Sequence, residues 1–359
     1  MIQTSYSIAV LPGDGIGREV MTAAVEVLSA LEAKLGRRFI AAQHPAGAQH
    51  YVDSGNALPD STLDACRAAD AILFGAMGLP HVRGADGTEI IPQLDIRFAL
   101  DLYAGLRPIR TWPGLPVPLS SPRAAEIDLV LVRESTEGLF HARGRGRIEG
   151  DAAYDTMKIT RAGTARVCDY AFELARQRKA QGKRGHVTNV DKANVFLSMA
   201  FWRRIFEERA ARFPDISTEH AYVDAMALNL VVKPWDYDVL VTENMFGDIL
   251  SDLIAALVGG MGMAPSADIG DRYALFQPAH GTAPDIAGKG IANPSAMILS
   301  VAMMLDWLAH RHSDAALAEG ARAIESALQL AFSSGAVRPR DFGGASGTAD
   351  ITRAVIERL

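Results

Sequence analysis

The sequence predicts an α/β fold, because apolar strands and amphipathic helices alternate along the whole chain. The first unit shows the pattern: the run SIAV passes through glycines into a segment with Ile16, Val20, Val27 and Leu31 at the spacing of one helix face. At 359 residues the chain also exceeds the ~250 to 300 residues at which a single core stops growing. We therefore expect two α/β lobes.

The later elements follow in the same order, with no fixed-period repeat and no low-complexity linker between them. The lobes should therefore be interleaved along the chain. Strands are expected at 41–47, 71–77, 127–135, 185–194 and 238–244, and helices at 59–69, 92–103, 196–213, from Asp248 onward and in two long C-terminal stretches.

Composition excludes several classes of protein. With 49% hydrophobic and 22% charged residues the chain is an ordinary globular one, and its net charge of −6 gives no general attraction to nucleic acid or an anionic membrane. Cys66 and Cys168 are too few for a disulfide framework. No signal peptide precedes the first strand and no apolar run approaches the ~20 residues of a membrane span. We expect buried thiols and a cytoplasmic protein.

The glycine loop LPGDGIG invites a dinucleotide-binding interpretation that its spacing does not support. Gly17 follows Gly15 by two residues rather than three, and no acidic residue ends a clear second strand at the usual distance. Two interpretations stay open: a tight turn that only glycine can make, or a loop lying close to a cofactor.

Three arginines suggest a site for an anion. Arg133 directly follows the apolar run LVLV, so its guanidinium should project from the strand end into a cleft where a carboxylate can accept its donors. The alternative is a surface pair with Glu134 or Glu137. Arg97 and Arg107, taken alone, would be solvated charges on a helix face.

A lysine and three aspartates suggest a catalytic base and a metal site beside that anion. Lys192 lies between a strand and a helix, and a lysine near other cations can serve as a neutral base, although a structural salt bridge is equally open. Asp248 and Asp252 lie four residues apart, hence on one helix face, and Asp224 is a third carboxylate from another element. Mg²⁺ or Mn²⁺ prefers such ligands, whereas solvated first-turn aspartates are the alternative.

Taken together, these motifs resemble those of the β-decarboxylating dehydrogenases, the family of 3-isopropylmalate, isocitrate, homoisocitrate and tartrate/D-malate dehydrogenases. The resemblance covers essentially the whole chain. The matching runs, in the family's order, are LPGDGIGREV, LYAGLRP, VRESTEG, VTNVDKANV, YVDAMALNLV, VTENMFGDILSDL and PAHGTAPDIAGKGIANP.

The resemblance implies the family's own fold rather than a Rossmann fold. It implies a doubly wound large domain from residues 1–100 and 258–359, which binds NAD, and a smaller α/β domain from 101–257 with a dimer-clasp arm. It also implies a homodimer with a shared active site, in which Lys192 and Asp224 complete the site of the partner subunit.

The family's roles carry over to matching positions. Arg97, Arg107 and Arg133 resemble the clamp for the substrate's carboxylates, and Lys192, with Asp224, resembles the catalytic base. Asp224, Asp248 and Asp252 resemble the ligands of Mg²⁺ or Mn²⁺. The residues that resemble the family's adenosine loop are His280, Gly281, Ala283, Asp285, Ile286 and Asn293.

Asp285 is the most informative residue of that loop. A carboxylate accepts hydrogen bonds from the ribose hydroxyls of NAD and repels the 2′-phosphate of NADP, so the resemblance implies NAD. A helix cap after Pro284 is the alternative.

The chain departs from the family at two positions. Phe140 replaces a tyrosine that helps to protonate the enolate, so decarboxylation would need His141, water or another route. Gln93 replaces a leucine of the substrate-specifying helix, beside the retained Leu94. The substrate's substituent would then carry a hydroxyl, unless Gln93 faces water.

We expect HARGRGR to be a strand with His141, Arg143, Arg145 and Arg147 on one face, which binds an anion or contacts a partner subunit.

The expected function is oxidation, with decarboxylation, of a 3-substituted malate by NAD. The first candidate substrate is 3-isopropylmalate, and tartrate or D-malate is the alternative. A non-catalytic regulatory homologue is a further alternative, against which the retained lysine, aspartates and arginines argue.

Overall fold

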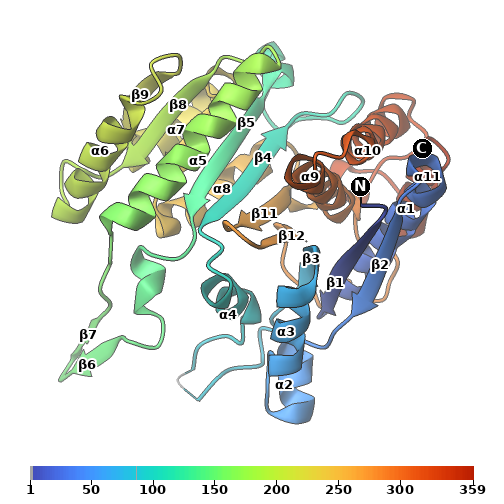
Figure 1. Cartoon of the computed structure of the whole chain (residues 1–359), viewed down its shortest axis with the longest axis horizontal. Coiled ribbons are helices and arrows are strands. Elements are labelled where there is room, and N and C mark those ends of the chain that lie inside the picture. The colour runs from blue at the N-terminus through green and yellow to red at the C-terminus, as the bar shows by residue number, and fades with distance from the viewer. Residues whose placement is uncertain (1–2, 86) are drawn as a thin grey trace.

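The fold is built on one sheet of ten strands, seen in a computed structural model that describes residues 3–85 and 87–359 (Figure 1). Their order across the sheet is β2-β1-β3-β12-β11-β4-β5-β10-β8-β9. The strands are β1 (Ser5–Gly13), β2 (Arg38–Gln43), β3 (Ala71–Ala76), β4 (Ala104–Arg110), β5 (Asp128–Glu134), β8 (His186–Asp191), β9 (Ser217–Tyr222), β10 (Val239–Thr242), β11 (Pro265–Ile269) and β12 (Ala274–Pro278).

The two halves of this sheet come from different parts of the chain. Strands from residues 1–100 and 258–359 form one half, and strands from 101–257 form the other. They meet where β11 pairs antiparallel with β4, and β4 pairs antiparallel with β5. The order differs from the 3-2-1-4-5-6 order of a Rossmann domain, so the predicted α/β fold of another type is confirmed. The domain limits themselves stay a prediction.

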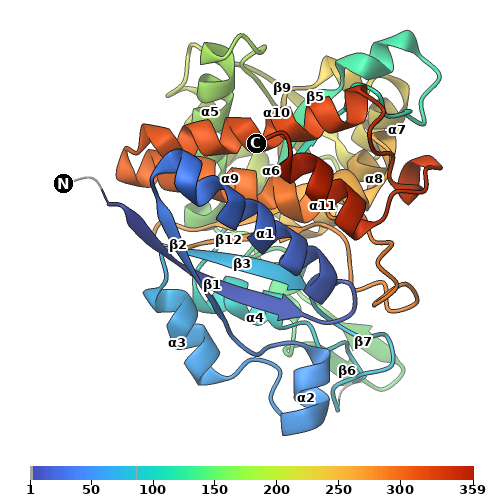
Figure 2. The same cartoon turned by 90° about the vertical axis from the view of Figure 1, so that its right-hand side faces the viewer.

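Helices cover both faces of the sheet, as Figure 2 shows for β1 to β3. One layer carries the largest buried apolar cluster and the other layer carries two smaller ones. The first layer holds α1 (Gly17–Leu35), α5 (Arg161–Ala180), α6 (Leu197–Ala210), α9 (Ser295–His312), α10 (Ala315–Ser333) and α11 (Thr348–Ile356). The second holds α2 (Ala48–Ser54), α3 (Asp60–Ala68), α4 (Pro92–Ala99), α7 (Val223–Val232) and α8 (Asn244–Leu257). Short 3-10 helices are η1 (Pro122–Glu126), η2 (Leu139–Ala142), η3 (Pro234–Asp236), η4 (Met261–Met263) and η5 (Arg340–Phe342).

Two helices have other limits than the sequence suggested. Helix α8 begins at Asn244, a full turn before Asp248, because the Glu243 carboxylate caps it by accepting hydrogen bonds from the backbone N–H groups of Met245 and Phe246. Helix α4 ends at Ala99, since Asp101 has a positive φ of 51° and β4 begins at Ala104.

The segment HARGRGR is not a strand, and that prediction was wrong. His141 belongs to η2, glycines 144 and 146 turn the chain, and Arg147 starts the short hairpin of β6 (Arg147–Glu149) and β7 (Ala152–Tyr154). The hairpin projects from the molecule in Figure 1. The basic side chains have separate partners: Arg143 binds Asp95, Arg145 binds His141 and Arg147 binds Glu149.

The glycine loop is a tight turn. Gly13 and Gly15 have φ values of 75° and 52°, and a Cβ atom on Gly15 would lie 2.1 Å from the carbonyl oxygen of Thr282. Only glycine tolerates both conditions, and the loop thereby fixes the segment that carries His280. Both cysteines are buried free thiols, as expected. Among the described residues, no helix has the length and apolar character needed to cross a membrane.

Candidate active site

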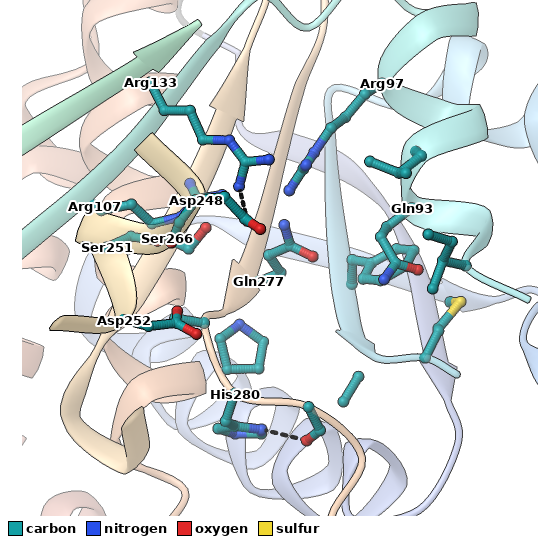
Figure 3. A pocket seen from close by; sticks show the side chains of 18 of the residues that line it. Gln93, Arg97, Arg107, Arg133, Asp248, Ser251, Asp252, Ser266, Gln277 and His280 are labelled. Carbon is teal, nitrogen blue, oxygen red and sulfur yellow. Dashed lines mark hydrogen bonds and ion pairs between the residues drawn. The ribbon is translucent and has the colours of Figure 1, made fainter. Parts of the chain in front are cut away.

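A cavity of about 260 Å³ lies where the two halves of the sheet meet (Figure 3). Its floor is formed by residues of β3, β4, β5, β11 and β12, and its walls are α4 and α8. The carboxyl ends of strands at a change of sheet direction are a common place for ligand sites in α/β proteins. The side chains of Arg97, Arg107 and Arg133, predicted to act together, all line it.

Arg97 and Arg107 are buried, with 6% and 5% of their surface exposed. Arg97 Nε donates to Asp268 Oδ2 at 2.9 Å, and Arg107 Nη2 lies 3.5 Å from Asp268 Oδ1. Burial lowers the pKa of Arg107 and Arg97 lowers it further, whereas Asp268 opposes both effects. The alternative of a solvated charge on a helix face is therefore excluded for both arginines.

Arg133 is 2% exposed, so the surface pair with Glu134 or Glu137 was also wrong. Its Nε and Nη2 donate to Asn244 Oδ1 at 2.9 and 2.7 Å, and Nη1 contacts Asp248. Its guanidinium carbon lies 4.9 Å from the ring centre of Phe140. Burial, and after it the charges of Arg97 and Arg107, lower the pKa of Arg133 to about 10, whereas Asp248 and Asp268 oppose this shift.

Asp248 and Asp252 point into the same cavity from successive turns of α8. Burial and the charge of Asp248 raise the pKa of Asp252, as expected for a carboxylate without a counter-ion of its own. Two hard oxygen donors on one face suit Mg²⁺ or Mn²⁺. Within the described parts of the chain, however, no three acidic, histidine or cysteine side chains gather as a complete metal site.

Lys192 and Asp224 lie away from this cavity and form an ion pair with each other. Lys192 follows the last residue of β8, and Asp224 lies in the first turn of α7. The surface around them is rich in exposed apolar side chains. These are Val195, Phe196, Leu197, Leu228, Val231, Val232 and, on α8, Ile249.

Only the N-terminal end of the predicted adenosine loop reaches the cavity. His280 and Gly281 line it, and burial lowers the pKa of His280. Ala283 has a positive φ of 36°, Asp285 is exposed and Ile286 packs on the main apolar cluster. The cap interpretation of Asp285 was wrong, because in the described chain the next helix is α9, ten residues later at Ser295.

Gln93 and Leu94 of α4 both line the cavity, so Gln93 does not simply face water. The Gln93 Oε1 atom is buried and has no hydrogen-bond partner among the described residues. Its neighbours in the wall include the apolar side chains of Phe74, Met77 and Ile91. His141 lies in a different surface pocket, so of the two aromatic residues only Phe140 reaches the cavity.

Several residues of the site were missed at the sequence level. Asn244 holds Arg133, Asp268 and Gln277 lie beside Arg97, and Asp341 accepts a hydrogen bond from Asn293 Nδ2 at 3.0 Å. One signal was available: Asp268 stands within an apolar strand, where a charge needs a partner. The others have side chains too common in loops and helix starts to stand out.

Comparison with known proteins agrees with this geometry. A model of the isocitrate/isopropylmalate dehydrogenase family matches residues 7–355. The chain is 42% identical to 3-isopropylmalate dehydrogenase of Aquifex aeolicus, over 99% of this chain and 97% of the other. It is 46% identical to that of Moorella thermoacetica, over 88% and 89%.

A solved structure gives the same result. The isocitrate dehydrogenase of Methylococcus capsulatus superposes with a TM-score of 0.87 at 38% identity, covering 98% of this chain and 99% of the other. Fold and cavity thus define an α/β dehydrogenase. The chain belongs to the isocitrate/isopropylmalate dehydrogenase family.

Proposed function

We propose that this chain is an NAD-dependent and divalent-metal-dependent dehydrogenase that oxidises and decarboxylates a 3-substituted malate. One observation carries the proposal: three buried guanidinium groups face two carboxylates of α8 across one small cavity. Buried cations of this number require anions, and a hydroxy dicarboxylate supplies two.

The chain's own residues bind and orient this substrate. Arg97 and Arg107 would bind one carboxylate of the substrate, and Arg133 would bind the other. Asn244 already holds the Arg133 guanidinium in one orientation, so little rotamer freedom would be lost on binding. The clamp also holds the C2 hydroxyl beside Asp248 and Asp252. Asp248 and Asp252 would hold a divalent ion there, which would supply Lewis-acid stabilisation of the substrate oxygen, and bound NAD would supply the hydride acceptor.

We further propose that the active unit is a homodimer. The exposed apolar surface around Lys192 and Asp224 is what a buried interface requires, and among residues 3–85 and 87–359 no third acidic, histidine or cysteine ligand joins Asp248 and Asp252. The partner subunit's Asp224 would supply that ligand, and the partner's Lys192 the base that takes the C2 hydroxyl proton. Residues 101–257 would form the domain that carries this interface.

The cofactor proposal depends on the loop after β12. His280, Gly281, Ala283, Ile286 and Asn293 would line the adenosine site, and the exposed Asp285 would accept hydrogen bonds from the ribose hydroxyls. Replacing Asp285 by lysine should shift preference toward NADP, measured as the ratio of kcat/KM for the two cofactors. An unchanged ratio would count against this contact.

The unpartnered Gln93 oxygen bears on the substrate's identity. An apolar isopropyl group would pack against Phe74, Met77 and Leu94 but would leave Gln93 Oε1 without a hydrogen bond. The C3 hydroxyl of tartrate would instead donate a hydrogen bond to Gln93 Oε1. 3-Isopropylmalate remains the first candidate, by similarity to the relatives named above. Tartrate, which Gln93 favours, is the second candidate, and D-malate is an equally ranked alternative.

Steady-state NAD reduction tests the proposal. 3-Isopropylmalate, D-malate, tartrate, isocitrate and homoisocitrate are each supplied with Mn²⁺ and then with EDTA. Metal-dependent turnover of one acid, with release of CO₂, supports the function. Turnover that persists in EDTA contradicts the roles of the aspartates, and binding without turnover supports the regulatory alternative instead.

A further inference from the structure

Two of the clamp arginines, Arg97 and Arg107, share a carboxylate that lies behind the cavity rather than in its wall. Asp268 is fully buried in β11. It accepts hydrogen bonds from Arg97 Nε at 2.9 Å and Gln277 Nε2 at 2.8 Å, and its Oδ1 lies 3.5 Å from Arg107 Nη2. All three donors belong to side chains that line the cavity, so Asp268 contacts the site only from behind.

The charge of Asp268 is fixed by these neighbours. Burial alone would raise its pKa, but Arg97, Arg107 and Arg133 together hold the pKa below its usual value. A carboxylate buried in this way is stable only while its donors stay in place. The same contacts therefore constrain the arginines.

The hydrogen bonds also decide which parts of the arginines stay available. Arg97 uses Nε, which leaves both Nη groups at the tip that points into the cavity (Figure 3). Arg107 Nη1 donates to the carbonyl oxygens of Leu106 and Ala267 at 2.9 and 3.2 Å, which orients its plane. A Cβ atom on Gly105 would lie only 3.0 Å from Asp268 Oδ1, so a side chain at this position of β4 would crowd the carboxylate.

We propose that Asp268 is a positioning residue that, with Gln277, aims Arg97 and Arg107 at a carboxylate of the ligand. The inference rests on the proposed function only in taking that ligand to be a dicarboxylate. Because the clamp holds ground state and transition state alike, loss of Asp268 should raise KM far more than it lowers kcat. A residue that only stabilised the fold would not produce this split.

Malonate, the smallest suitable dicarboxylate, serves as the probe in calorimetry on the full-length protein. Asp268→Asn should weaken malonate binding roughly 10- to 100-fold, the scale of a misplaced binding group, and raise the KM of the best acid by a similar factor. Mn²⁺ affinity should stay unchanged, because Asp248 and Asp252 lie on α8. Gln277→Met, which keeps the size but removes the donor, should weaken malonate binding by about five- to tenfold.

Asp271→Asn is the matched control, since Asp271 is exposed in the turn after β11 and its carboxylate accepts a hydrogen bond from Tyr103 Oη at 3.1 Å rather than from a clamp arginine. It should bind malonate as the wild type does. The inference is overturned if Asp268→Asn folds and binds malonate normally, or if it loses Mn²⁺ and malonate in equal proportion. Should that variant not fold, normal binding by Gln277→Met overturns it. If no acid is oxidised but Asp268→Asn still weakens malonate binding, the proposed function fails and the positioning role stands.

Discussion

The arginine clamp and the Lys192–Asp224 pair differ in how far a single chain completes them. The clamp arginines are 2 to 6% exposed and each has fixed partners in the same chain. The Asp224 side chain is 67% exposed, lies among exposed apolar residues and has Lys192 as its ion-pair partner. An ion pair so exposed contributes little by itself. The clamp is therefore complete within one chain, whereas in the proposed homodimer the pair would act in the site of the partner subunit.

Complementation between two inactive variants would give the largest effect. Lys192→Met and Arg97→Met should each reduce kcat/KM roughly 10³-fold, through loss of the base and of the clamp. In a mixed dimer one site carries both substitutions and the other carries neither. Refolding the two variants together should therefore restore about a quarter of wild-type activity, since half of the dimers are mixed. Each variant refolded alone is the control, and no recovery on mixing would place all the residues of a site in one chain.

Disrupting the apolar surface should have the next largest effect. Leu228 is 65% exposed on α7, and Leu228→Glu should dissociate the dimer and reduce activity at least about tenfold, because a charge would be buried in the interface. Light scattering measures the mass. Leu330→Glu is the matched control, since Leu330 is 55% exposed on α10, distant in sequence from the pair. Equal behaviour of both variants would contradict the assignment of this surface.

Within the clamp region, Gln93→Leu should change selectivity rather than assembly. Removing the unpartnered, buried Oε1 atom should raise kcat/KM for 3-isopropylmalate relative to tartrate by about tenfold, the value of one hydrogen bond to a buried group. Asp95→Asn, on the exposed side of the same helix, is the control and should keep the ratio. A ratio unchanged in Gln93→Leu would show that this side chain does not contact the substituent.

The last prediction concerns the pH dependence of stability rather than activity or assembly. Glu134, 1% exposed beside Arg133, has its pKa raised by burial from 4.5 to about 7. The folded protein thus holds this proton more tightly than the unfolded chain. The contribution of Glu134 to stability is full below pH 4.5 and is lost as pH rises through 7, a change of roughly 3 kcal/mol. Denaturant unfolding of Glu134→Gln should lack this loss while light scattering stays unchanged. A pH dependence equal to that of the wild type would contradict the shift.

The sequence predicted the individual elements and the clamp better than their arrangement. Apolar periodicity located β1, β3, β5, β8 and β10, but it missed β4, β11 and β12, and the strand expected at 41–47 ends at Gln43. Arg133 after LVLV indicated a cleft because a buried guanidinium cannot remain unpaired. Periodicity says nothing about pairing over long separations, so the contact of β3 with β12 could not be read from it. The resemblance to a family supplied the fold where local physics did not.

The errors have physical causes as well. Alternating arginines in HARGRGR look like one face of a strand, but the intervening glycines favour turns, and each arginine found a separate acceptor. Asp268 went unnoticed because its role depends on β11 lying between β4 and β12, which is a property of the sheet.

The strand order also determines which part of the sheet can fold first during synthesis on the ribosome. β3 pairs with β12, and roughly 200 residues separate Ala76 from Ala274, so the first lobe must wait for most of the polypeptide to be translated. The segment 101–257 contributes five adjacent strands and can assemble first. Until then β1 to β3 expose an unpaired apolar edge, which is a hazard for aggregation. Expression yield in this fold should therefore depend on how quickly the last hundred residues follow the rest.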